Sequence, residues 1–142
     1  MINLSITIKQ PASEIWEAIT NKEQMKEWYF DIQDFELKIG AEFHFYEPGE
    51  QKIFLHLCEI KEIIPQKKLA HTWTHPNHSS GSSLLTWELN EYENQTLVTL
   101  KHEGIESFAD AGKEFTVESY EVGWNELLSE LKTKLENKLN KE

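Results

Sequence analysis

The spacing of the hydrophobic residues changes along this chain, and the changes restrict the folds open to it. Apolar and polar residues alternate over residues 2–8 and, with turn signals between the runs, from 34 to 102. This alternation is typical of half-buried strands. From Val117 to Leu139 the apolar residues instead recur at helical spacing, in one stripe of about six turns. Short connections allow the strands to pair as an antiparallel meander, so the sequence predicts an α+β fold.

Two short helices are expected between the first strand and the meander. Pro11 suits the first turn of a helix because its missing N–H would be unpaired there in any case. Asn21 is the expected N-cap of a second helix, which carries Met25 and Trp28.

We expect one domain, residues 1–142, in which a curved antiparallel sheet of about seven strands wraps around the long C-terminal helix. The runs at 34–39 and 52–63 each predict a strand, the second with a bulge or bend. Residues 75–83, rich in Pro, Asn, Ser and Gly, predict the least structured loop. Because a strongly bent sheet cannot touch a straight helix along its whole length, a cavity is expected between them.

Charge and composition exclude several classes of partner. The chain carries 14 basic and 25 acidic residues, a net charge of −11, and every basic residue is a lysine. Nucleic acids select basic surfaces and arginine forks, and anionic membranes also select positive charge, so neither partner is expected. No apolar run reaches the roughly 18 residues of a membrane span, and no signal peptide is visible, so a cytoplasmic location is expected. Cys58 is the single cysteine, which excludes an intrachain disulfide and a cysteine-cluster metal site.

Aromatic residues are abundant and favour a pocket. The chain has five Trp, seven Phe and four Tyr, and each could equally be ordinary core. On the expected inner face of the sheet and the stripe of the long helix, large rings and imidazoles give these candidate ligand-binding residues: Trp28, Phe43, Phe45, His56, His71, Trp73, Trp87, His102, Tyr120 and Trp124.

Two groups of potential metal or ligand contacts stand out among the histidines. His71, His75 and His78 form the densest group, and imidazoles can bind zinc or copper. Strand positions four residues apart lie about 13 Å from each other, however, so neither a metal nor another cofactor is expected. His56 and Cys58 share a strand face and could touch one ligand atom together; the alternative is a buried cysteine acting as a small hydrophobe.

His102 is the one candidate catalytic residue, and no catalytic role is assigned firmly. It shares a face with Val98 and Leu100 where the sheet should meet the long helix. An imidazole there could orient a ligand carbonyl or act as an acid or base. The alternative is a core histidine that is hydrogen-bonded to a backbone carbonyl. No local signature of a Ser-His-Asp or Cys-His arrangement accompanies it.

An ordered set of motifs resembles the START-like (SRPBCC), helix-grip superfamily, and within it the domain found in activators of the heat-shock protein 90 ATPase. The motifs are PASEIWEAIT at 11–20, KIGAEFHF at 38–45, EIIP at 62–65, TLKHEG at 99–104 and GW at 123–124. Relatives commonly carry Arg-Pro-Gly-Gly where this chain has Lys38-Ile39-Gly40-Ala41, so any bidentate anion contact by that arginine is weakened here.

The resemblance implies a pocket for hydrophobic ligands or a protein-binding role, without fixing a reaction. Binding of a small hydrophobic or amphipathic molecule between the sheet and the C-terminal helix ranks first among our hypotheses. A protein-interaction domain that activates a chaperone ATPase ranks second. A cyclase-type enzyme that uses a pocket histidine ranks third.

Overall fold

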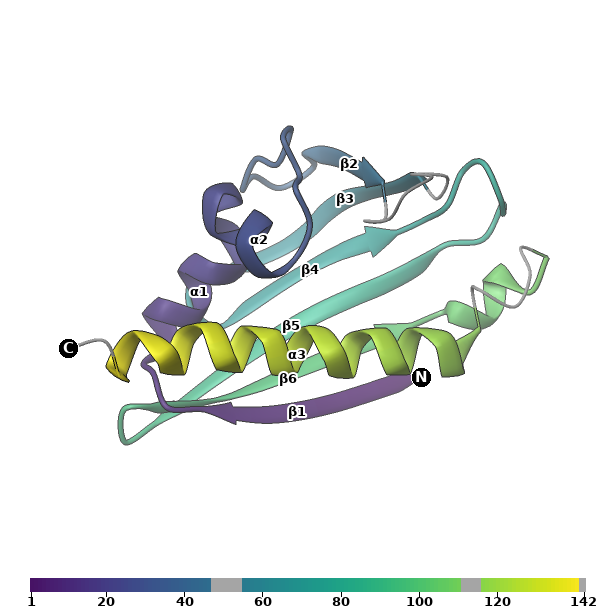
Figure 1. Ribbon diagram of the computed structural model, residues 1–142. Coiled ribbons are helices and arrows are strands. Elements are labelled where there is room, and N and C mark those ends of the chain that lie inside the picture. Colours follow the sequence, from purple (N-terminus) through teal and green to yellow (C-terminus); the bar gives the residue numbers. More distant parts are fainter. Residues whose placement is uncertain (47–54, 111–115, 141–142) are drawn as a thin grey trace.

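The computed structural model describes residues 1–46, 55–110 and 116–140. The elements, in chain order, are β1 (Ile2–Ile8), α1 (Ala12–Thr20), α2 (Lys22–Trp28), β2 (Glu42–Tyr46), β3 (Leu55–Ile64), β4 (Lys68–Trp73), β5 (Ser83–Tyr92), β6 (Gln95–Glu103), the 3-10 helix η1 (Ile105–Phe108) and α3 (Val117–Asn140). The predicted order of strand, two helices, meander and long helix is confirmed (Figure 1).

The strands form one antiparallel sheet in the order β1-β6-β5-β4-β3-β2. The chain therefore runs as a meander from β2 to β6, and β1 adds to the outer edge of β6. The pairing of β3 with β4 shifts between Ile60 and Glu62, which is the irregularity that the sequence predicts for this long strand. Glu93 and Asn94 both adopt positive φ in the tight turn between β5 and β6.

The sheet has six strands in the described part of the chain, and the expected strand at 34–39 is absent. These residues instead form turns, in which the Phe35 N–H donates to the Ile32 carbonyl and the Ala41 N–H to that of Lys38. Phe35 is buried at 8% exposure, whereas Ile39 is 57% exposed. The sequence alternates here, but of its apolar residues only Phe35 is buried, and this segment pairs with no strand. Gly40 closes the turn at a φ of +84°, which disfavours any residue with a side chain.

The helix α3 lies across one face of the sheet and packs against β1 (Figure 1). Leu128, Leu131 and Leu135 are buried beneath it, as the predicted apolar stripe requires. Polar contacts fix its second half: the Lys132 ammonium donates to the Thr7 carbonyl, and the Gln10 side-chain amide donates to the Leu135 carbonyl at 2.8 Å. No helix among the described residues has the length and apolar character of a membrane span.

The two short helices are capped in different ways. The Asn21 side chain accepts from the backbone of Glu23 and Gln24, so the predicted N-cap of α2 is confirmed. Helix α1 follows Pro11, whose side chain cannot cap it. The Glu91 carboxylate, on β5, accepts from the Ala12 N–H at 2.7 Å instead. A negative group at a helix N-terminus also complements the helix dipole.

We expect Glu91→Ala to lower the free energy of unfolding by about 1 kcal/mol, because the first N–H of α1 loses its acceptor. Glu91→Gln keeps an acceptor oxygen and should lose less. Urea denaturation measures both, with Glu17→Ala on the exposed face of α1 as the control. Equal losses for Glu91→Ala and Glu17→Ala would show that the carboxylate does not cap the helix.

Candidate functional site

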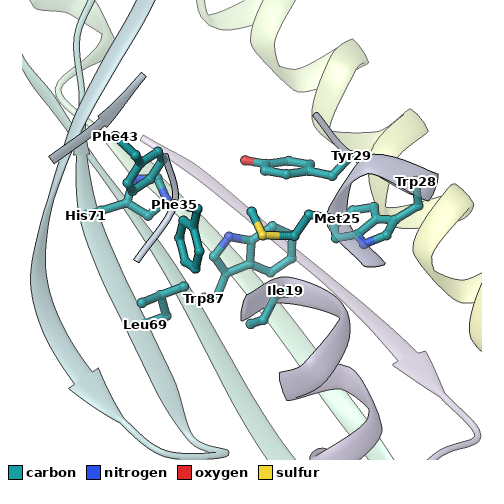
Figure 2. A pocket seen from close by; sticks show the side chains of 9 residues that line it. All are labelled: Ile19, Met25, Trp28, Tyr29, Phe35, Phe43, Leu69, His71 and Trp87. Atoms are coloured by element: carbon teal, nitrogen blue, oxygen red, sulfur yellow. The ribbon is translucent and has the colours of Figure 1, made fainter. Parts of the chain in front are cut away.

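An enclosed cavity of about 10 Å³ lies between the two short helices and the inner face of the sheet (Figure 2). By this measure it holds about one water molecule. The residues that line it come from α1, α2, the segment that follows α2, and the three strands β2, β4 and β5: Ile19, Met25, Trp28, Tyr29, Phe35, Phe43, Leu69, His71 and Trp87. Four of the ten predicted ligand-binding residues are among them: Trp28, Phe43, His71 and Trp87.

Rings packed against one another build the wall of this cavity. Trp28 stacks on Tyr29 with ring centroids 4.8 Å apart and meets Trp87 edge-on at 6.1 Å. Phe43 meets the rings of Phe35 and His71 edge-on, each at 5.1 Å. Among the described residues, no Lys, Asp or Glu side chain lines the cavity. Its chemistry is therefore apolar apart from the few polar atoms on its aromatic and imidazole rings.

Tyr29 places a polar atom without a protein partner at this cavity. Its hydroxyl oxygen is buried and has no hydrogen-bond partner among the described residues. Burial raises the pKa of Tyr29 well above its usual value, and the nearby Cys58 thiol adds to the rise. Figure 2 shows the ring extending from the end of α2, with the hydroxyl toward the side where Phe43 and His71 lie.

His71 is held as one neutral tautomer. Its Nδ1 lies 2.9 Å from the Thr72 carbonyl oxygen, which can only accept, so Nδ1 carries the hydrogen. Burial lowers the pKa of His71 to about 4, which keeps the ring neutral at pH 7. In a neutral ring with hydrogen on Nδ1, the other nitrogen, Nε2, is a hydrogen-bond acceptor.

A second group of polar side chains is buried where α3 begins. The Trp124 indole N–H can only donate, so Nδ1 of His102, 3.1 Å away, accepts. The hydrogen of His102 is then on Nε2, which donates to the Ser83 hydroxyl at 2.7 Å. The Ser83 hydroxyl in turn donates to the Trp73 carbonyl at 2.8 Å. His102 is thus a core histidine with both nitrogens occupied, held by side chains rather than by a backbone carbonyl.

The polarity of this chain of hydrogen bonds differs from that of a catalytic triad. In a triad, a carboxylate accepts from the histidine and the other ring nitrogen takes the proton of the serine. Here Trp124 donates to His102, and His102 donates to Ser83. Burial, together with the charges that His71 and His75 would carry, lowers the pKa of His102 to about 3. The geometry therefore does not supply a base, and the catalytic role of His102 stays a prediction.

Tyr120, which lies one helical turn before Trp124 in α3, belongs to the same group. Its hydroxyl accepts from the Trp73 indole N–H at 3.2 Å and is hydrogen-bonded to Nε2 of His75. His75 is 1% exposed, and burial lowers its pKa to about 4. We call Trp73, His75, Ser83, His102, Tyr120 and Trp124 the α3 anchor. Four predicted ligand-binding residues, Trp73, His102, Tyr120 and Trp124, belong to it and are absent from the cavity wall.

Phe45 and His56, the remaining predicted residues, fill the space between the two groups. Their rings stack with centroids 4.5 Å apart, and Phe30 stacks on the other side of Phe45 at 4.6 Å. Cys58 is 1% exposed on the same strand face as His56, and burial raises the pKa of its thiol. This is the environment of a small hydrophobe rather than of a reactive thiolate.

Residues 75–83 are irregular but well anchored, so the prediction of the least structured loop is only partly met. The Ser79 hydroxyl lies 2.6 Å from the Asp110 carboxylate, and the Ser107 hydroxyl donates to the Ser82 carbonyl. A Cβ on Gly81 would lie 2.2 Å from the Ser107 carbonyl oxygen, so this close approach requires glycine. No group of three metal-ligating side chains is found in the described residues.

Sequence reasoning missed the polar atom of the cavity. Tyr29 and Phe30 follow Trp28 directly, and this run of three aromatic residues is the signal that was available. A helical pattern could not place Tyr29, because the helix ends at Trp28 and Tyr29 has a non-helical backbone. Phe35, Met25 and Leu69 were passed over because nothing distinguishes such apolar residues from ordinary core.

We expect the stability of the protein to fall as the pH drops from 7 toward 4. In the unfolded chain a histidine titrates near 6.5, whereas burial lowers the pKa of His71, His75 and His102 to about 4, 4 and 3. Between these values only the unfolded chain binds the protons, so each histidine removes up to about 1.4 kcal/mol per pH unit. Urea denaturation at pH 7.5, 6.5, 5.5 and 4.5 measures the slope. A constant stability from pH 7 to 5 would contradict the burial of neutral rings.

We expect Trp124→Phe to lower the free energy of unfolding by about 2 kcal/mol, because Nδ1 of His102 is left buried without a donor. Nitrogen-15 NMR of the wild type should show His102 with its hydrogen on Nε2, and the variant should lose this preference. Trp16→Phe is the matched control, because the Trp16 indole is not part of the α3 anchor. A wild-type His102 with its hydrogen on Nδ1 would refute the assigned tautomer, and an unchanged His102 signal in Trp124→Phe would show that the Trp124 indole does not fix it.

Comparisons with known proteins agree with this architecture. Solved structures with the same fold include Mll3558 from Rhizobium loti, with a TM-score of 0.80, 18% identity, and coverage of 94% of this chain and 95% of that one. The Aha1 dimer from Colwellia psychrerythraea has a TM-score of 0.66 and 25% identity, with 94% of each chain covered. DynU16, from the dynemicin biosynthetic locus, has a TM-score of 0.76 and 18% identity; 95% of this chain matches it, spanning 46% of its length.

A search of curated protein sequences gives no match. The family model described as "Activator of Hsp90 ATPase homolog 1-like protein" matches residues 9–136. This match covers both short helices, the meander and nearly all of α3. It therefore confirms the resemblance to the START-like, helix-grip superfamily, and the chain belongs to the family of Activator of Hsp90 ATPase homolog 1-like proteins.

Proposed function

We propose that this protein binds a small, mainly apolar molecule at the cavity between α2 and the inner face of the sheet. The observation that carries the proposal is an enclosed space with aromatic walls and no charged lining residue. Apolar pockets with a few polar groups are the usual form of small-molecule sites. This proposal differs from the expected gap under α3 in that it assigns the site to the side of the sheet covered by α2.

A ligand larger than one water requires side chains to move, and the segment after α2 is the part best suited to this. Tyr29 and Phe30 are only partly buried, and the residues from Tyr29 to Ala41 belong to no helix or strand. The opposite wall is formed by Leu69 and Trp87, which are paired in the central strands β4 and β5. We therefore assign the opening motion to the Tyr29–Phe30 segment, with the sheet as the fixed wall.

We expect toluene to raise the thermal midpoint of the wild-type protein, and Leu69→Phe to weaken this binding at least tenfold. The larger side chain fills the cavity, at a cost of about 1–3 kcal/mol in stability. Leu57→Phe is the matched control, because Leu57 is half-buried on the opposite face of the sheet. Thermal-shift titration measures the binding, and native mass spectrometry detects a molecule that co-purifies.

Equal toluene binding by wild type and Leu69→Phe would place the ligand elsewhere. The absence of both a co-purified molecule and a thermal shift would overturn the proposal. It would favour the second candidate, a domain that acts on a chaperone ATPase, which the family description supports. If that candidate is right, we expect the cognate Hsp90 to hydrolyse ATP faster when the purified protein is added.

A further inference from the structure

We propose that the ligand of this cavity carries an uncharged hydroxyl group, as in a phenol or an apolar alcohol, which hydrogen-bonds to Tyr29 and His71. This inference rests on the proposed function and names the chemical class of its ligand. It follows from the Tyr29 hydroxyl and the His71 imidazole on the cavity wall and from the absence of charged side chains among the described residues that line it.

Tyr29 and His71 offer different hydrogen-bonding groups to the same cavity. The Tyr29 hydroxyl is buried without a partner among the described residues, so it has a hydrogen to donate and lone pairs to accept. His71 uses Nδ1–H on the Thr72 carbonyl, so its Nε2 offers only a lone pair. Both residues line a cavity of about 10 Å³. In a space of one water, a single small group can reach both.

One hydroxyl group can form a hydrogen bond with each of these two side chains. It can donate its hydrogen to Nε2 of His71 while its oxygen accepts from the Tyr29 hydroxyl. A ketone, an ether or a carboxylate has no hydrogen for Nε2 and would set lone pair against lone pair. The low pKa of His71 supports this assignment, because the ring does not become a donor at pH 7.

Charge on the ligand is disfavoured by the same wall. The described part of the chain places no lysine or carboxylate on the cavity wall, so a carboxylate or an ammonium would be buried there without a counter-charge. The remainder of the wall, including Trp28, Phe35 and Trp87, suits an aromatic or aliphatic ring. The fitting ligand is therefore an apolar ring or chain that bears a neutral hydroxyl.

Phenol, toluene and benzoate test this inference because they share a ring and differ in one group. We expect wild-type protein to bind phenol at least fivefold more tightly than toluene, and benzoate more weakly than either. Tyr29→Phe and His71→Leu should each reduce the phenol preference to about twofold or less, while toluene affinity stays within twofold of wild type. Tyr92→Phe, an exposed tyrosine at the β5–β6 turn, should bind as wild type does. Saturation-transfer NMR and thermal-shift titration measure these affinities.

A Phe35→Ala variant provides a second test, in which a ligand can enter the cavity without any movement of the lining side chains. Removing this buried ring leaves room beside Phe43 on the cavity wall, and phenol should raise its thermal midpoint more than toluene does. If toluene binds as tightly as phenol in both proteins, the hydroxyl inference is overturned and the proposed function stands. If neither molecule binds either protein, the proposed function itself fails. Tight binding of benzoate would also overturn the inference.

Discussion

The placement of α3 on the sheet depends on directional hydrogen bonds from buried rings. Burial of Leu128, Leu131 and Leu135 holds the helix to the sheet, but apolar contact is non-directional and specifies position only through shape. The α3 anchor adds bonds whose atoms must meet within a few tenths of an ångström, among them those of Trp124 and Tyr120. The anchor fixes the first two turns of α3, and the rest of the interior is arranged around that placement.

The buried polar groups divide into two sets with different consequences. In the α3 anchor, His102 has a partner on each nitrogen, which is the condition for a polar group to stabilise a core. At the cavity, Tyr29 has a hydroxyl with no protein partner, and His71 uses its one hydrogen on a backbone carbonyl. Buried polar groups with hydrogen-bond partners make the core rigid. A buried polar group without a protein partner can instead form a new hydrogen bond with a ligand. The site hypothesis therefore moves from His102 to Tyr29 and His71.

How well the sequence predicts a structural feature depends on how far apart in the chain the interacting residues lie. The cap at Asn21 depends on neighbours within a few residues, and it was predicted. The predicted strand at 34–39 is absent because alternation of residue types does not show whether a partner strand is present, and without one only Phe35 is buried. The capping of α1 by Glu91 crosses 79 positions of sequence, which no local pattern reveals.

Periodicity by itself determined the α+β class, the inward face of the paired strands other than β3 and the stripe of α3, because these depend on the chain's own repeat. It also gathered ten candidate residues on one interior face. Only the tertiary structure decided which of them share a cavity and why His71, His75 and His102 are neutral. The partners that fix the tautomer of His102 lie 19 and 22 residues away, in elements whose relative register is set by packing. The preference for one tautomer depends on such neighbours, so it is fixed only once the sheet and α3 have come together.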